Sequence, residues 1–290
     1  YGGPTTGWLI VDPTWNAVLS GLEGAFPGRE VNVIDYTDDM SKILFSTSSS
    51  NFPPAYYILT DKKILQELGS SRPGMDVASM RATEFTYYTA RDGMQIPAFV
   101  TLPKGWKKED GPIPFVVLPH GGPWARDDAG WDGSGWPQFL ATRGYGVMQP
   151  QYRGSSGFGR ELWLAGDGER GQKMQDDKDD GAAWLVKDGY AKKDQIAIFG
   201  YSYGGFAAMA ATVRENGPFR CAIAGAGVSN LTRIGNNWSE SRLQRVIQGN
   251  TVKGMDPMRN TDKANIPILV YHGDRDVRVP LFHGVDFYNA

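Results

Sequence analysis

The amino-acid sequence predicts an α/β fold, with a mostly parallel sheet flanked by helices, preceded by a β-rich segment. From about residue 84 onward, short apolar strand patterns alternate with helical patterns, which is typical of βαβ units. Before residue 80, short strand patterns are separated by turn clusters. We therefore expect a β-rich segment over residues 1–80 and an α/β domain over residues 81–290.

The β-rich segment is expected to contain strands at 8–11 and 42–46 and a hairpin over 55–65. Turn formers, such as those at 51–54, separate these strands. Two or so hairpins bury too little apolar surface to be stable alone. We therefore expect this all-β module to be the end of a larger β domain, or a cap packed on the second domain.

Strands of the second domain are expected wherever a short apolar run lies between turns, at 84–89, 96–102, 115–119, 146–150, 195–199, 221–226 and 268–271. Helices are expected at 136–142, 176–188 and 205–213, with another beginning near 281. Because a run such as 115–119 is continuously apolar, its strand should be buried on both faces of the sheet.

Composition and charge narrow the function classes. The formal net charge of -2 provides no basic field for nucleic acid. No run of 18 apolar residues occurs, so no membrane segment is predicted. Cys221 is the only cysteine and its apolar neighbours predict a buried structural thiol, and no cluster of His and Cys suggests a metal. We expect no metal and no cofactor; the compartment and the oligomeric state, a homo-oligomer included, stay open.

A candidate nucleophile lies in the sequence Gly200-Tyr201-Ser202-Tyr203-Gly204. This G-x-S-x-G pattern follows a predicted strand and precedes a predicted helix, which is the context of the nucleophile elbow in the α/β-hydrolase fold. The tight turn strains the serine, exposes its hydroxyl and leaves no room for side chains at the flanking glycines. The alternative is a glycine-rich turn with an incidental serine. We favour Ser202 as a catalytic nucleophile.

Backbone donors for an oxyanion are expected from two turns. His120-Gly121-Gly122-Pro123 follows a predicted strand, and such turns supply an amide to the oxyanion hole of hydrolases. We select the amide of Gly122 and that of Tyr203, the residue after the candidate nucleophile. His120 precedes the serine in the chain, whereas this fold places its histidine last, so we expect a structural role for it.

The triad acid is expected after the strand 268–271, where two aspartates compete. Asp276 lies further into the loop and is our choice for the acid. Asp274 is expected to cap the loop through backbone hydrogen bonds. Both aspartates could instead be ordinary turn residues.

A histidine should follow the acid in this fold, but the only later one is His283. Seven residues after Asp276 leave no room for the usual helix, strand and loop, so we expect His283 to be an ordinary helix residue. Serine without a general base is a poor nucleophile. The chain begins at Tyr1 and ends at Ala290, and we expect a trimmed form that is inactive unless a C-terminal piece supplies the base.

Taken together, these motifs resemble the prolyl oligopeptidase family, which includes acylaminoacyl peptidases and dipeptidyl aminopeptidases. The matching stretches, in the expected order, are 120–123, 151–159, 200–205 and 272–280. The resemblance implies a β-propeller that gates a peptidase domain, residues 1–80 being its final strands. It also implies that Ser202 and Asp276 belong to a triad, and that Gly122 and Tyr203 donate to the oxyanion.

The function expected from this resemblance is a serine peptidase that cleaves short peptides through an acyl-enzyme. Two other functions stay open: a carboxylesterase with the same triad, and a non-catalytic binding protein on the same scaffold. Substrate preference and the choice between exopeptidase and endopeptidase are not predicted. Arg153 is expected to pair with carboxylates among residues 176–180 and to hold its loop, although it could instead face the substrate.

Overall fold

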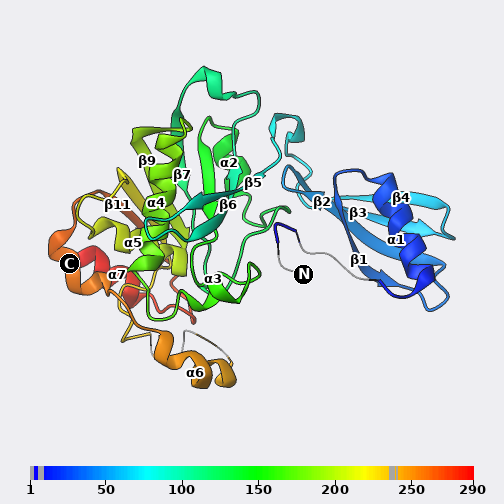
Figure 1. Ribbon diagram of the computed structural model, residues 1–290. Helices are drawn as coiled ribbons and strands as arrows, with labels where there is room; N and C mark the ends of the chain where they lie inside the picture. The colour runs from blue at the N-terminus through cyan, green and yellow to red at the C-terminus, as the bar shows by residue number, and fades with distance from the viewer. Residues whose placement is uncertain (1–2, 6–9, 235–238, 240) are drawn as a thin grey trace.

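The computed structural model describes residues 3–5, 10–234, 239 and 241–290. These residues form a four-stranded sheet near the start of the chain and a seven-stranded sheet with helices around it (Figure 1). The larger sheet is mostly parallel, which confirms the predicted α/β fold and the β-rich stretch before it.

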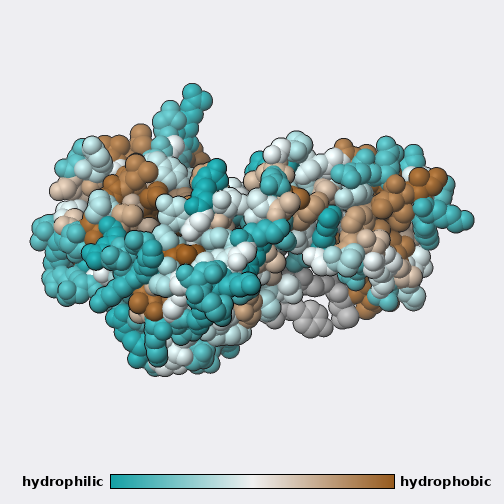
Figure 2. Space-filling view, turned by 90° about the horizontal axis from the view of Figure 1, so that it is seen from above, coloured by the Kyte–Doolittle hydropathy of each residue, from teal (hydrophilic) through white to brown (hydrophobic). Residues whose placement is uncertain are grey.

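The smaller sheet is antiparallel, and its four strands are neighbours in chain order. They are β1 (Glu30–Tyr36), β2 (Lys42–Ser49), β3 (Phe52–Thr60) and β4 (Ile64–Ser70). The helix α1 (Pro13–Ala25) lies across this sheet (Figure 1). Leu22 of this helix packs with Phe45, Ala55 and Tyr57 of the sheet. Apolar residues also gather on the surface at this end of the molecule (Figure 2).

The helix α1 was not expected, and the all-β prediction for this segment is wrong in that respect. Of the strand expected at 8–11, residues 8 and 9 lie outside the described residues, and Ile10 and Val11 lead into the helix without forming a strand. Asp12 caps the helix by accepting a hydrogen bond from the Trp15 amide at 2.9 Å. Asp12 followed by Pro13 is a helix-start signal that could have been recognised.

The larger sheet has the strand order β11-β10-β9-β7-β8-β6-β5. The strands are β5 (Glu84–Thr89), β6 (Gln95–Thr101), β7 (Ile113–Val117), β8 (Gly146–Pro150), β9 (Ala191–Tyr201), β10 (Cys221–Gly225) and β11 (Ile268–Tyr271). β5 and β6 form an antiparallel hairpin, and β7 to β11 run parallel. All seven predicted strands are confirmed, although the Cys221 side chain at the start of β10 is only half-buried.

The helices around this sheet include each one that was predicted. They are α2 (Trp136–Ala141), α3 (Arg160–Leu164), α4 (Lys173–Lys187), α5 (Tyr203–Thr212), α6 (Arg242–Gln248) and α7 (Phe282–Asn289). Short 3-10 turns occur at η1 (Val77–Ser79), η2 (Lys108–Asp110), η4 (Gly249–Thr251) and η5 (Pro257–Lys263). Every residue of α5 is buried, because its alanines and glycines let it pack closely on the sheet. The short helices α3 and α6 were not predicted.

The parallel strands end at one edge of the sheet, and this edge carries the candidate site. Gly225 of β10 is level with Tyr201 of β9 and with Tyr271 of β11. The chain therefore leaves β9 at Ser202 and β11 at His272 on the same edge. In α/β sheets, ligands bind beside the carboxyl ends of the strands.

Candidate active site

Ser202 occupies a strained turn between β9 and α5. Its backbone has φ 58° and ψ -117°, a conformation that residues other than glycine rarely adopt. Its amide donates to the Gly225 carbonyl at 2.9 Å, and its own carbonyl accepts from the Phe206 amide at 2.9 Å. These bonds hold the strained residue between strand and helix. The predicted strand–turn–helix context of this serine is therefore confirmed.

The glycines beside Ser202 are required by close backbone packing. A Cβ on Gly200 would collide with the backbone of Gly204, and a Cβ on Gly204 would collide with the carbonyl of Pro119. A Cβ on Gly205 would meet the carbonyl of Gly225. The turn thus presses against the end of the neighbouring strands, and a side chain at any of these glycines would push it away.

Ser202 is half-buried and lines a cavity of about 250 Å³. Gly122 and Tyr203 line the same cavity. So do Arg278 and Val279, which come from the loop that carries the candidate acid. The structure therefore brings together the serine turn, the glycine turn and the loop after β11, which lie far apart in the sequence.

His120 holds the glycine turn through two hydrogen bonds. Its Nδ1 lies 2.6 Å from the Gly121 carbonyl, and its Nε2 lies 2.8 Å from the Ser155 hydroxyl. A carbonyl only accepts, so Nδ1 carries the proton. Burial lowers the pKa of His120 to about 4, which favours the neutral ring near pH 7. The Ser155 hydroxyl lies 2.8 Å from Nε2 and 2.7 Å from the Tyr152 carbonyl, so it joins the imidazole to the loop after β8. The expected structural role of His120 agrees with these contacts.

The bond from His120 orients one peptide plane beside the serine. The Gly121–Gly122 peptide is trans, so its carbonyl and its N–H point in opposite directions. Because His120 binds the carbonyl of Gly121, it fixes the direction of the Gly122 amide. A Cβ on Gly121 would lie 3.5 Å from the Ser202 Cβ, so this peptide lies directly against the serine.

Tyr152 connects the two turns that carry the candidate amide donors. Its ring stacks on His120 with centroids 4.5 Å apart, and on Tyr203 with centroids 5.6 Å apart. Its hydroxyl donates to the His120 carbonyl at 2.8 Å. The buried Nζ of Lys178 lies 3.5 Å from the Tyr152 ring centroid, and burial lowers the pKa of this lysine to about 7. The stacking role of Tyr152 was not foreseen, because it depends on residues distant in the chain.

The Asp276 carboxylate is bound by its own loop. Its Oδ1 accepts hydrogen bonds from the amides of Arg278, at 2.9 Å, and Val279, at 2.8 Å. Among the described residues Oδ2 has no hydrogen bond, and His272 Nε2 lies 3.7 Å from it. Asp274 is exposed. The prediction that Asp274 caps this loop is wrong, because these backbone amides bind Asp276.

The other two histidines also have structural contacts. Nε2 of His272 lies 2.7 Å from the carbonyl of Val279 and must donate to it. His283 lies in α7, fully buried, with Nδ1 3.4 Å from the Ser229 hydroxyl. Burial lowers the pKa of His283 to about 4. The prediction that His283 is a helix residue is confirmed.

Arg153 has the structural role that we favoured. It is buried, and it binds Asp177 through both its amide and its guanidinium, with distances of 2.7–3.0 Å. It also forms a bidentate pair with Asp92 at 2.9 and 3.1 Å. Asp177 confirms the predicted partner range 176–180, whereas the contribution of Asp92 from the β5–β6 turn was not foreseen. This ion pair fixes the loop after β8 to α4.

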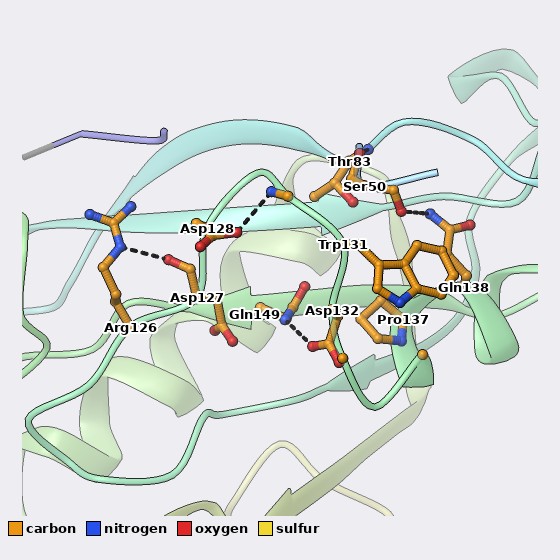
Figure 3. A pocket seen from close by; sticks show the side chains of 13 residues that line it. Ser50, Thr83, Arg126, Asp127, Asp128, Trp131, Asp132, Pro137, Gln138 and Gln149 are labelled. Carbon is orange, nitrogen blue, oxygen red and sulfur yellow. Dashed lines mark hydrogen bonds between the residues drawn. The ribbon is translucent and has the colours of Figure 1, made fainter. Parts of the chain in front are cut away.

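A second cavity, of about 210 Å³, contains several acidic side chains (Figure 3). Asp127 binds Gln151 at 2.8 Å, and Gln149 donates to Asp132 at 3.3 Å. Burial raises the pKa of Asp127 to about 7.

Within the described ranges, no group of three or more His, Cys, Asp or Glu is placed to hold a metal ion. Over the same ranges, no helix is long and apolar enough to cross a membrane.

The strained serine on the edge of a mostly parallel sheet, beside a glycine turn, defines an α/β-hydrolase fold with a nucleophile elbow. Comparison with protein families gives the more specific assignment. The model of the prolyl oligopeptidase family matches residues 131–290, more than half of the chain. The chain belongs to the prolyl oligopeptidase family.

Curated relatives agree with this assignment. Dipeptidyl aminopeptidase BIII of Pseudoxanthomonas mexicana is 34% identical over 94% of this chain and 42% of its own length. Dipeptidyl peptidase family member 6 of Caenorhabditis elegans is 29% identical over 93% of this chain and 41% of its own length. The chain thus spans about two fifths of the length of these relatives.

Solved structures support the fold. A puromycin-hydrolyzing peptidase of Mycobacterium tuberculosis matches with a TM-score of 0.72 and 22% identity, over 86% of this chain and 39% of that one. An acylaminoacyl peptidase of Pyrococcus horikoshii matches with a TM-score of 0.65 and 21% identity, over 89% and 42% of the two chains. At these identities, the likeness concerns the fold.

Proposed function

We propose that the protein containing this chain is a serine peptidase that cleaves short peptides through an acyl-enzyme. Ser202 attacks the scissile carbonyl, and Asp276 orients the histidine that takes the serine proton. The observation that carries this proposal is the strained backbone of Ser202, at the carboxyl edge of the sheet and on a cavity shared with two other motif segments. Backbone strain of this kind is retained mainly at functional sites.

The amides of Gly122 and Tyr203 are the proposed oxyanion donors. Both residues line the cavity that contains Ser202. The bond from His120 to the Gly121 carbonyl fixes the Gly122 amide before substrate arrives. Preorganised donors of this kind stabilise the charge that develops on the carbonyl oxygen in the transition state.

The general base is proposed to be a histidine other than the three in this sequence. His120, His272 and His283 are each held by structural partners. The Oδ2 atom of Asp276 has no hydrogen bond among the described residues, which leaves it available to an incoming imidazole. The Oδ1 atom is occupied by loop amides that fix the carboxylate in place.

The two-domain organisation is also a proposal. Residues 1–80 would be the end of a β-propeller and residues 81–290 the catalytic domain. A four-stranded antiparallel sheet with its strands in chain order is the unit from which propeller blades are built, and β1 to β4 have this arrangement.

The test uses the full-length protein that contains this chain, with a fluorophosphonate probe and two substrates, a dipeptidyl p-nitroanilide and a p-nitrophenyl ester. Wild type should be labelled and should cleave the anilide, and Ser202→Ala should lose both activities. A matched control is Ser20→Ala, which removes a hydroxyl at an exposed position of α1 outside the cavity lining and should keep the labelling. An enzyme that cleaves only the ester would be a carboxylesterase, and an intact protein without labelling would be a binding protein.

A further inference from the structure

The cavity at Ser202 contains a second polar group that the proposed reaction does not use. Arg170 lies on the segment between α3 and α4, and it lines this cavity together with Ser202. Only 5% of its surface is exposed. A buried guanidinium that opens into a catalytic cavity is a candidate for substrate recognition.

The guanidinium of Arg170 lies against aromatic rings, and Asp167 is near enough to act on its charge but forms no hydrogen bond or ion pair with it among the described residues. It lies 5.0 Å from the Trp124 ring and 5.7 Å from the Tyr203 ring. No hydrogen bond or ion pair to a carboxylate is formed by this side chain within the described ranges. Arg153, which is equally buried, binds two aspartates.

An unpaired buried charge is unfavourable, because the group gives up its hydration without a compensating anion. Burial accordingly lowers the pKa of Arg170 from its ordinary value, although arginine remains protonated. An anion that entered the cavity would supply the missing partner. The guanidinium can bind both oxygens of a carboxylate through parallel hydrogen bonds.

The backbone of Arg170 is held by a neighbouring segment of the chain. Its amide donates to the Lys253 carbonyl at 3.3 Å, and its carbonyl accepts from the Met255 amide at 2.8 Å. A Cβ on Gly254 would collide with this carbonyl, so the two segments lie in direct contact. Trp124 directly follows the turn that contains Gly122, and Tyr203 directly follows Ser202, so the guanidinium lies near both segments that carry the proposed oxyanion donors.

We propose that Arg170 binds a carboxylate of the substrate, which makes the protein selective for peptides that carry an acidic group next to the scissile bond. The lining residues of the cavity that the structure describes include two arginines and no acid. Its volume of about 250 Å³ suits one residue better than a large ligand. This inference rests on the proposed function, because the carboxylate is placed relative to the bond that Ser202 attacks.

The carboxylate could come from two sources, and two pairs of substrates distinguish them. The first pair is a dipeptidyl p-nitroanilide with Glu or with Gln before the scissile bond, which tests an acidic side chain. The second pair is a tripeptide with a free or an amidated C-terminus, which tests the terminal carboxylate of the leaving part. Each pair differs by one charge at nearly constant shape.

In the full-length protein, kcat/KM should be at least tenfold higher for the acidic member of one pair, since hydrogen bonds to charged groups are worth this much or more. Arg170→Met should bring that ratio close to one. Arg170→Lys should keep part of the preference, because lysine retains the positive charge but cannot donate the two parallel hydrogen bonds of a guanidinium. Arg143→Met, a change at an exposed arginine at the end of α2, should leave the ratio unchanged.

A wild-type ratio near one in both pairs, or a preference that survives Arg170→Met, would overturn the inference. Fluorophosphonate labelling of each variant separates this failure from failure of the proposed function, because labelling reports Ser202 alone. If the wild type is not labelled, the inference is tested by ligand binding to Ser202→Ala, measured by isothermal titration calorimetry. Tighter binding of N-acetylglutamate than of N-acetylglutamine, lost with Arg170→Met, supports the inference, and equal binding overturns it.

Discussion

Two His-Gly turns lie at the carboxyl edge of the same sheet, and they hold their loops in different ways. His120 follows β7 and His272 follows β11, and each imidazole binds a backbone carbonyl of the loop that it begins. Both nitrogens of His120 have partners. In His272 the buried Nδ1 has no hydrogen-bond partner among the described residues.

The two turns differ in how many of their polar side-chain atoms have hydrogen-bond partners. His120 binds the Gly121 carbonyl and Ser155 and stacks on Tyr152. Both of its ring nitrogens therefore have partners on the side of the site that carries the proposed oxyanion donors.

The His272 turn fixes the proposed acid through loop amides, but among the described residues it leaves His272 Nδ1 and Asp276 Oδ2 without hydrogen bonds. A buried polar atom without a partner, as His272 Nδ1 is here, costs about 1–3 kcal/mol. We expect the acid side to be the more easily disturbed.

The largest effect is expected from Asp276→Asn in the His272 turn. The amide oxygen of Asn can still accept from Arg278 and Val279, so the loop should keep its shape. The variant nevertheless loses the charge that stabilises an imidazolium, and kcat should fall about 10⁴-fold. The measurement is anilide hydrolysis by the full-length protein. Asp274→Asn, at an exposed position of the same loop, should change kcat less than about twofold, and the opposite ranking would reject Asp276 as the acid.

Much of this edge could be predicted from the sequence, because its signals are local. The elbow at Ser202 depends on glycines within three residues of it. The strands at 115–119 and 195–199 were recognisable as mostly apolar runs between turns. These features depend on backbone sterics and burial, which a short window of sequence already contains.

The missed features depend on contacts between distant segments. The sequence does not indicate a role for Arg170, because only the fold places it near Trp124 and on the cavity that contains Ser202. The support that Tyr152 gives to His120 and Tyr203 joins three separate loops. No pattern of spacing predicts which ring will stack on which, because tertiary packing decides it. For the same reason, Asp92 was missed as a partner of Arg153.

The next largest effect concerns the pH dependence of stability on the His120 side. Burial lowers the pKa of His120 from 6.5 to about 4. The unfolded chain therefore takes up this proton at a higher pH than the folded protein does. The contribution of His120 to the free energy of unfolding should be fully present above about pH 6.5. It should be lost as the pH falls from about 6.5 toward 4, and the loss should be on the order of 3 kcal/mol.

Urea unfolding of wild type and His120→Asn at pH 7 and at pH 4.5 measures this contribution. The Asn variant cannot titrate, so its stability should fall less over this interval. Asp127 and Asp179, whose pKa values burial raises to about 7, act in the opposite sense in both proteins and cancel in the difference. Equal pH dependence in the two proteins would mean that His120 is protonated in the folded state, contrary to the lowered pKa that its burial implies.

The smallest effect should come from Gly284→Ala, which tests the open side of the His272 turn. A Cβ on Gly284, in α7, would lie 2.8 Å from His272 Nδ1 and 3.3 Å from its Cβ. The imidazole must shift, and with it the bond from Nε2 to Val279 that holds the acid loop. Overpacking of this kind costs about 1–3 kcal/mol, against up to about 1 kcal/mol gained from alanine in a helix. Gly24→Ala in α1 has nothing within 4 Å of the new Cβ and should be neutral or stabilising. If the two variants melt alike, there is room beside His272 Nδ1, and the contrast between the turns is smaller than their contacts indicate.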